Sequence, residues 1–228
     1  MSLYAIGDLH LSMDGTKSMD VFGGRWTDYV NKIRRGFSLL NDDDVCVLCG
    51  DLAWGMTLDA AREDFRLLSE LPGRKIILKG NHDYWWTTAA KAYRFFEEQG
   101  FSNLEILNNN CYFYEDCAIC GTRGWFFEEE KGDEHDKKIL PREIGRLETS
   151  LKAAGDREKI IFLHYPPKYL GYECPEILSL FVRYGVKRCY YGHIHGKGHA
   201  SAFQGEYAGT QYRLVSADYL DFYPLKVE

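Results

Sequence analysis

The sequence has no apolar run that approaches the length of a membrane span, and it leaves no room for a signal peptide. Residues 1–6 lead directly into the polar motif Gly7-Asp8-Leu9-His10. A membrane helix needs about 20 predominantly apolar residues, and a secretory signal needs a longer apolar stretch followed by a cleavage site. We therefore expect a cytoplasmic protein that does not associate with membranes.

The chain also lacks an excess of positive charge. Its 28 Lys and Arg residues are outnumbered by 34 Asp and Glu residues, which gives a net charge of −6. Proteins dedicated to nucleic-acid binding usually carry a basic surface, so we expect no such partner. A phosphate substrate is still compatible with this balance, because bound metal ions can dominate the local field.

Cysteine is present in an odd number, seven, which argues against a disulfide framework. In a chain with no export signal we expect reduced thiols. Two pairs, Cys46/Cys49 and Cys117/Cys120, have the C-x-x-C spacing of a zinc ribbon. Both pairs lie in apolar, strand-like runs rather than in turns, which favours buried small hydrophobic side chains over ligands.

No internal repeat, low-complexity segment or linker is visible in the 228 residues, of which 45% are hydrophobic. This size and composition predict a single domain over residues 1–228. Helical spacing of apolar residues predicts helices over 29–40, 58–71 and 87–99, between apolar runs that resemble buried strands. The βαβαβ order predicts an α/β fold with a largely parallel sheet.

The second half of the chain has a different pattern. Runs 111–114 and 117–120 flank a Glu-Asp turn and predict a hairpin. Residues 126–141 are highly charged and predict a mobile surface loop. Helices are expected over 142–154 and 174–184, a strand over 159–163, and antiparallel strands within 201–215.

Five apolar runs end in the same way, with Asp, Asn or His in the next few positions. In open α/β sheets, ligands lie outside the carboxyl ends of the strands, so one converging site explains all five ends. Each motif alone could be an ordinary polar turn. The residues at these ends are Asp8, His10, Asp51, Asn81, His82, Asp83, His164, His193 and His195.

Together these motifs resemble the signature of the calcineurin-like metallophosphoesterase superfamily. They occur in the order found in that family and span residues 8 to 195, most of the chain. Phe22-Gly23, Trp26 and residues 121–125 are also similar to an uncharacterised bacterial branch of predicted phosphohydrolases. The resemblance implies a four-layer α/β/β/α sandwich with mixed sheets, whereas the pattern alone supports only α/β with a mixed sheet.

The resemblance further implies two metal ions. One would be held by Asp8, His10, Asp51 and His195, and the other by Asp51, Asn81, His164 and His193, so that Asp51 bridges them. Mixed carboxylate and imidazole ligands suit transition metals such as Mn, Fe or Zn better than Ca or Mg alone.

The same resemblance implies hydrolysis of a small phosphoester, either a monoester or a diester, by attack of a metal-bridging hydroxide. His82 would be the general acid that protonates the leaving group, with Asp83 fixing its orientation. The alternative is that His82 only braces its loop.

Other activities stay open at this stage. Residues 52–55 after Asp51 lack the Asp-Arg-Gly of Ser/Thr protein phosphatases, and His82 is followed by Asp rather than Glu, which disfavours that class. A nuclease would normally have a basic groove, and a non-catalytic interaction module would not need the complete ligand set. Trp54, Tyr84, Trp85 and Trp86 lie near the ligands and could stack on a nucleobase or simply pack.

Arg123 is the candidate for substrate binding. It lies in a Gly-rich turn, and its planar guanidinium matches two phosphate oxygens. Residues 123–141 could then close over the site as a lid. The alternative is a surface ion pair between Arg123 and one of the acids in 128–136.

Overall fold

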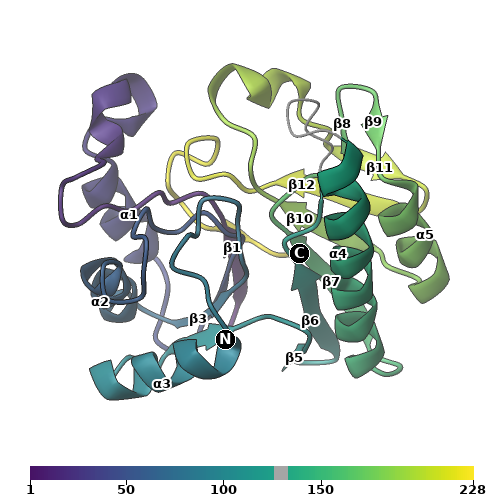
Figure 1. The fold of residues 1–228 in the computed structure, drawn as a ribbon, viewed down its shortest axis with the longest axis horizontal. Coiled ribbons are helices and arrows are strands. Elements are labelled where there is room, and N and C mark those ends of the chain that lie inside the picture. The colour runs from purple at the N-terminus through teal and green to yellow at the C-terminus, as the bar shows by residue number, and fades with distance from the viewer. Residues whose placement is uncertain (126–132) are drawn as a thin grey trace.

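The computed structural model describes residues 1–125 and 133–228. Two β-sheets face each other at the centre, with helices α1, α2 and α3 outside one sheet and α4 and α5 outside the other (Figure 1). This is the four-layer α/β/β/α arrangement that the resemblance implied. No helix among the described residues is both long and apolar enough to cross a bilayer.

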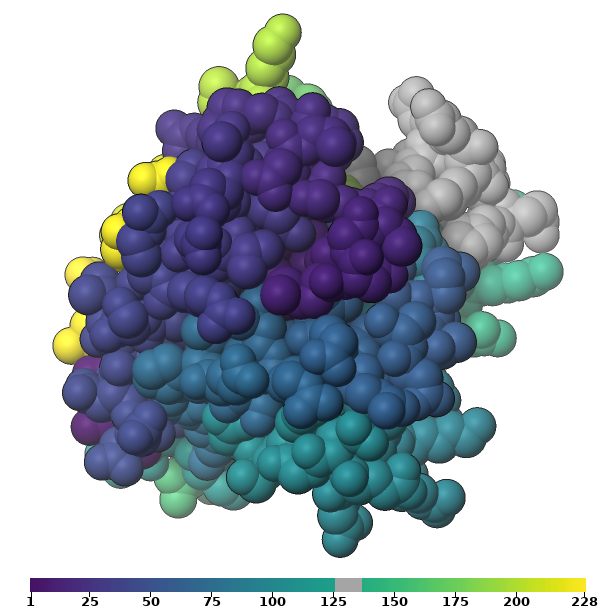
Figure 2. All heavy atoms as spheres, turned by 90° about the vertical axis from the view of Figure 1, so that its left-hand side faces the viewer, coloured from purple at the N-terminus to yellow at the C-terminus, as the bar shows by residue number. Residues whose placement is uncertain are grey.

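The first half of the chain supplies one sheet and its helices, and it forms most of the face seen in Figure 2. The sheet has the order β13-β1-β2-β3-β4; β1 to β4 are parallel, and β13 pairs antiparallel with β1. Its strands are β1 Leu3–Ile6, β2 Val45–Leu48, β3 Arg74–Ile77, β4 Leu104–Ile106 and, from the C-terminus, β13 Leu225–Lys226. The helices are α1 Tyr29–Phe37, α2 Arg62–Glu70 and α3 Ala89–Gln99, with the short 3₁₀ turns η1 Met19–Phe22 and η2 Gly24–Trp26.

The second sheet has the order β11-β12-β10-β7-β6-β5, in which β6, β7, β10 and β12 are parallel and the two edge strands are antiparallel. Its strands are β5 Tyr112–Tyr114, β6 Cys117–Thr122, β7 Glu158–Leu163, β10 Arg188–Tyr191, β11 Gly205–Tyr207 and β12 Thr210–Leu214. The other elements are α4 Asp133–Ala153, the hairpin of β8 Lys168–Tyr169 and β9 Tyr172–Glu173, α5 Pro175–Tyr184 and η4 Gly196–Ser201.

Strand β2 shows why the layers form. Val45 and Val47 lie in the core between the two sheets, whereas Cys46 and Leu48 lie in the core between the first sheet and its helices. Successive side chains of a strand point to opposite faces, so a continuous apolar run is buried on both sides, as parallel strands require. The apolar runs that preceded the polar motifs in the sequence are these two-sided strands.

Most predicted elements are present within a few residues of their expected bounds, including the hairpin of β5 and β6 and the antiparallel pair of β11 and β12. One helix start was wrong. Helix α4 begins at Asp133 rather than at 142 and contains Pro141, so residues 133–141 are helical and not a loop. An interior proline usually costs about 3 kcal/mol, which is why the sequence predicted a boundary there; packing of α4 on β6 outweighs that cost. Residues 126–132 of the expected lid lie outside the described part of the chain.

The seven cysteines are free thiols, and Cys46, Cys49, Cys120 and Cys189 are buried. The pair Cys46/Cys49 belongs to the first sheet and Cys117/Cys120 to the second, and the possible metal-binding groups of the described residues contain no cysteine. Cys46, Cys49 and Cys120 are therefore the small buried side chains that the sequence predicted, whereas Cys117 is only half-buried.

Candidate metal centre

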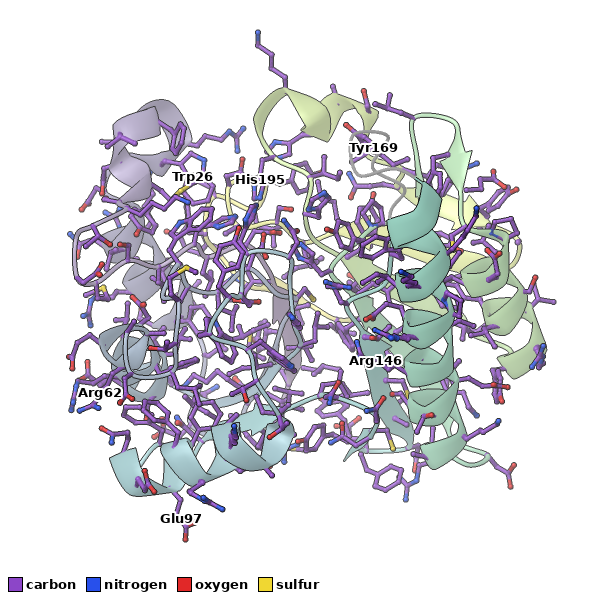
Figure 3. All side chains as sticks on the ribbon, viewed as in Figure 1. Trp26, Arg62, Glu97, Arg146, Tyr169 and His195 are labelled. Carbon is purple, nitrogen blue, oxygen red and sulfur yellow. The ribbon has the colours of Figure 1, made fainter. Side chains whose placement is uncertain are left out.

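The carboxyl ends of strands from both sheets meet at one edge of the sandwich. Backbone hydrogen bonds join the loops there: Asp8 N donates to Gly50 O (2.8 Å), Gly7 N to Val215 O (2.7 Å) and Gly192 N to His164 O (3.1 Å). The first of these links two strand ends of the first sheet, the second joins the two sheets, and the third links two strand ends of the second sheet. Figure 3 shows His195 and Trp26 at this end of the molecule.

Two groups of side chains at this edge have the composition of metal sites. Asp8, His10 and His195 form one group, and Asp51, His164 and His193 form the other; within each group the ligand atoms lie within 4.8 Å of one another. Asn81 joins the second group, because its Oδ1 lies 2.6 Å from His164 Nε2. The structure thus brings together all seven side chains that the sequence nominated as ligands. That they bind metal ions stays a prediction.

Asp51 lies between the two groups. Its Oδ2 is 3.8 Å from His10 Nε2 and 3.6 Å from His164 Nε2. Its Oδ1 accepts a hydrogen bond from the backbone N–H of His82 at 2.7 Å. One carboxylate oxygen therefore fixes the loop after β3, while the other faces ring nitrogens of both groups.

The donors of the first group fit a bound cation. Asp8 Oδ1 is buried and has no hydrogen-bond partner among the described residues, which is costly for a carboxylate oxygen. It faces His195 Nε2 at 3.4 Å, and His10 Nε2 and His195 Nε2 face each other at 3.3 Å. Two imidazole nitrogens and an unsatisfied carboxylate oxygen around one point are the donor set that borderline transition metals prefer.

Groups behind the ligands hold the imidazole rings. His195 Nδ1 lies 2.9 Å from Asp218 Oδ1, and His164 Nδ1 lies 3.0 Å from the carbonyl oxygen of Cys49. When Nδ1 donates to such an acceptor, Nε2 is left unprotonated and directed at the metal position. Asp218 is 1% exposed and was missed in the sequence, although it follows β12 just as the ligands follow their own strands.

The backbone at the site is strained. Asp8, His10, Asp51 and His193 have φ values of 60°, 47°, 53° and 72°, a region that non-glycine residues seldom occupy and that often marks functional sites. Close packing adds to this constraint, because a Cβ on Gly80 would lie 2.1 Å from Asp51 Oδ1. The loops are therefore shaped to present these side chains.

Burial and mutual charge shift the pKa values of the ligands. Burial lowers the pKa of His164 to about 4 and that of His10 well below its usual value. Burial, together with the charges of Asp83 and Asp8, raises the pKa of Asp51. Burial opposes protonation of His195 as well, but Asp8 and Asp218 raise its pKa to about 10. Neutral His10 and His164 are in the form that binds metals, whereas His195 would release its Nε2 proton when a metal ion binds.

His82 lies beside the ligands without belonging to either group. Its ring centroid is 5.8 Å from that of His10 and 4.7 Å from that of Trp54. Its Nδ1 lies 3.2 Å from the hydroxyl of Tyr84, and Tyr84 is 49% exposed. The ring therefore lies between the metal centre and the protein surface.

The sequence predicted that Asp83 orients His82, and the hydrogen bonds of its carboxylate in the structure go to other groups. Its two oxygens accept hydrogen bonds from the backbone N–H groups of Asp51, Leu52 and Gly80 at 2.7–2.8 Å and from the indole of Trp85 at 3.0 Å. Asp83 is buried. These four donors fix the loops after β2 and β3. An orienting effect of Asp83 on His82 stays a prediction.

Arg123 lies against helix α4. Its Nη2 is 3.5 Å from Glu143 Oε1, and its guanidinium lies 5.0 Å from the ring centroid of Trp125. Among the described residues, the acid that it meets is Glu143; the side chains of 128–136 lie outside the described part of the structure. The structure leaves its contact with a substrate as a prediction.

Two of the tryptophans near the ligands differ in role. Trp54 stacks on His10 with ring centroids 4.8 Å apart and is only partly buried. Trp85 is 2% exposed and packs edge-on against Phe65 in the core. Of these two, the residue at the site is Trp54.

Comparison with known proteins finds a distant relative and several proteins of similar fold. A protein of Coxiella burnetii (strain RSA 493 / Nine Mile phase I), named as a probable cyclic nucleotide phosphodiesterase, is 21% identical over 202 residues, which are 83% of this chain and 74% of the relative. Phosphopantetheinyl hydrolase of Mycobacterium tuberculosis has a similar fold, with a TM-score of 0.61 at 15% identity over 99% of this chain and 95% of its own. A protein of unknown function from Aquifex aeolicus has a TM-score of 0.52 at 15% identity, with the same shares covered.

The family to which the chain belongs follows from a match that covers most of its length. The model of the calcineurin-like phosphoesterases matches residues 1–197, and this range contains both groups of ligands. The chain therefore belongs to the calcineurin-like phosphoesterase family and is a metal-dependent phosphohydrolase.

Proposed function

We propose that the protein hydrolyses a small phosphoester at a centre of two metal ions that share Asp51. The observation that carries this proposal is the position of Asp51 Oδ2, which faces ring nitrogens of both ligand groups at 3.6 and 3.8 Å. Asp8, His10 and His195 would complete one site, and Asn81, His164 and His193 the other. The donor set suits Mn, Fe or Zn.

Two such ions, when bound, would lower the pKa of a water and neutralise charge on the phosphate. The protein's own contribution is to hold the donors in place before the substrate arrives. Asp218 and the Cys49 carbonyl orient His195 and His164, and Asp83 ties together the loops that carry Asp51 and Asn81.

We assign His82 as the general acid. It lies beside His10 on the accessible side of the centre, where a leaving group can reach it. Because Nδ1 is 3.2 Å from the Tyr84 hydroxyl, Nε2 is the atom that would deliver the proton. Partial exposure of the ring lets it regain a proton from solvent after each turnover.

A phosphodiester is the first substrate to test, because the curated relative is named as a probable phosphodiesterase. The exposed Tyr84 beside His82 offers an aromatic face to an organic group on the substrate. The Trp54 ring is already stacked on His10 and contacted by the ammonium of Lys17. A small substrate fits the net charge of −6 better than a polyanion does.

The experiment compares bis-p-nitrophenyl phosphate with p-nitrophenyl phosphate on the protein reconstituted with Mn²⁺. We expect metal-dependent hydrolysis of at least one of them, with loss of activity in Asp51→Asn. A single-stranded oligonucleotide and a phosphopeptide serve as further substrates. Selective cleavage of either one would favour a nuclease or a protein phosphatase, and inactivity on all four with metal bound would favour a non-catalytic module.

A further inference from the structure

We propose that Lys79, Arg123 and Arg146 bind a second anionic group of the substrate. This inference rests on the proposed function and narrows the class of substrate. The enzyme would act on phosphoesters that carry a second phosphate or a carboxylate a few atoms from the scissile group.

The three cations line a small cavity where β4 and β6 end. The described residues around it also include the carboxylate Glu143. The cavity has a volume of about 20 Å³, which is room for roughly one water molecule. A larger anion would therefore bind at its mouth, where Arg146 has a side chain 44% exposed. Figure 3 shows Arg146 beside α4, on the side toward the centre of the molecule.

The charges at this cavity do not balance among the described lining residues. Glu143 is 1% exposed, and both of its oxygens are engaged. Oε1 lies 2.5 Å from Arg146 Nη1 and 3.5 Å from Arg123 Nη2, and Oε2 accepts a hydrogen bond from the Thr122 hydroxyl at 2.7 Å. Among the described lining residues, one carboxylate therefore shares the cavity with three cations, two of which it contacts.

Arg123 has unused hydrogen-bonding capacity. Its side chain is only 16% exposed, and its Nε is buried without a hydrogen-bond partner among the described residues. A buried, partly unsatisfied guanidinium is costly and is well suited to a phosphate or carboxylate, which it can bind through two parallel hydrogen bonds. Among the described lining residues the positive charges exceed the negative ones, in a protein whose net charge is −6, and such a group of cations would attract anions.

The cluster is built on the same backbone as the second ligand group. Lys79 is two residues before Asn81. The carbonyl oxygen of Arg123 accepts hydrogen bonds from the backbone N–H groups of His164 (3.2 Å) and Tyr165 (2.8 Å). These links place the backbone of Lys79 and Arg123 beside Asn81 and His164. On our proposal, a substrate with two anionic groups would bind the metal centre and the cluster at once.

Calorimetry on the Mn²⁺-loaded protein tests this without turnover. The probes are methylphosphonate, with one anionic group, and bisphosphonates whose two groups are separated by one to four carbons. We expect at least one bisphosphonate to bind about tenfold or more tightly than methylphosphonate. Arg146→Gln should remove this gain and leave methylphosphonate binding unchanged within about twofold. Arg183→Gln is the matched control, because Arg183 is 62% exposed and pairs with Glu148.

Glu143→Gln should change bisphosphonate affinity in the opposite direction. Removal of the single carboxylate should tighten bisphosphonate binding, which a merely structural role of Glu143 would not do. If this variant fails to fold, the comparison of Arg146→Gln with Arg183→Gln decides. Equal weakening of both kinds of probe by Arg146→Gln, or no bisphosphonate tighter than methylphosphonate, would overturn the inference.

Two further outcomes separate this inference from the function on which it rests. Metal-loaded protein that fails to bind methylphosphonate would contradict the proposed function itself. Inorganic phosphate could also bind at two sites per chain, one of which is lost in Arg146→Gln. If no bisphosphonate then binds more tightly than methylphosphonate, the cluster is a site for free phosphate, and its assignment to the substrate is overturned.

Discussion

Single residues behind the ligands set the direction of the imidazole rings. Asp218 is the clearest case, because one of its oxygens contacts His195 Nδ1 and the other accepts the backbone N–H of Gly196 at 3.0 Å. It also lies 3.2 Å from His199 Nε2. Loss of such a partner typically weakens metal binding by about 10–100-fold.

We therefore expect Asp218→Ala to lower the affinity of one of two bound metal ions by about that factor, with the other ion little affected. Asp218→Asn retains an acceptor and should lose less. The control is Asp221→Asn, at an exposed position three residues away. Metal titration followed by elemental analysis measures the effect, and equal affinities in Asp218→Ala and Asp221→Asn would show that Asp218 does not position a ligand.

His82 should affect chemistry rather than metal binding. We expect His82→Ala to lower kcat by about 10²–10⁴-fold, the usual contribution of a general acid, with metal content nearly unchanged. The loss should be largest for substrates with poor leaving groups, because these need the proton most. A loss of the same size for good and poor leaving groups would instead indicate a structural role.

Asp64 gives a stability prediction that is independent of catalysis. It is 4% exposed and accepts a hydrogen bond from the backbone N–H of Met13 at 2.7 Å. Burial, with a smaller effect of Asp14 and Glu63, raises its pKa from 3.8 to about 6. The pKa of Asp64 is higher in the folded state than in the unfolded state, so the protonated form stabilises the fold. This stabilisation is complete below pH 3.8 and is lost as the pH rises through about 6.

Asp64→Asn keeps the acceptor without the charge. Near pH 4 the variant and the native protein should therefore have the same free energy of unfolding. Above pH 7 the free energy of unfolding of the variant should be higher by on the order of 1–3 kcal/mol. Urea unfolding at both pH values measures this difference. A variant that is less stable than the native protein at pH 7.5 would show that the buried charge of Asp64 does not destabilise the folded protein.

At the scale of elements, the loops after the strands are constrained by close backbone approach. A Cβ on Gly80 would meet Asp51 Oδ1 at 2.1 Å and Asp51 N at 2.3 Å. We expect Gly80→Ala to displace Asp51 and to abolish tight metal binding. Gly145→Ala is the control, because nothing lies within 4 Å of its added Cβ in helix α4, and a helix gains about 1 kcal/mol from this change. Normal metal content in Gly80→Ala would contradict the packing argument.

How far the sequence could predict each element depended on how local its signal was. Strands β1, β2 and β3 were predictable because their apolar runs stop at ligand-type residues, and β7 and β10 for the same reason. The start of α4 could not be predicted, because Pro141 and the charged residues before it suggest a loop. The helix packs on β6, which is distant in the chain, and no local pattern shows this contact. Asp218 is a lone acid after β12, and only the fold shows that it contacts His195.

At the scale of the whole molecule, the site depends on how the two sheets face each other. Asp8, Asp51 and Asn81 come from the first sheet, and His164, His193 and His195 from the second. The core between the sheets includes Val47 and Ile76 on one side and Ile160 and Phe162 on the other. Since each ligand group draws side chains from both sheets, this core sets the distances within the centre.

The central claim is that these residues bind two metal ions that share Asp51. The most direct test is the metal content per chain after reconstitution with Mn²⁺, combined with electron paramagnetic resonance of the bound ions. We predict two ions per chain with a spectrum of coupled Mn²⁺, and loss of the coupling in Asp51→Asn. A single ion per chain, or two ions without magnetic coupling in the native protein, would contradict the account.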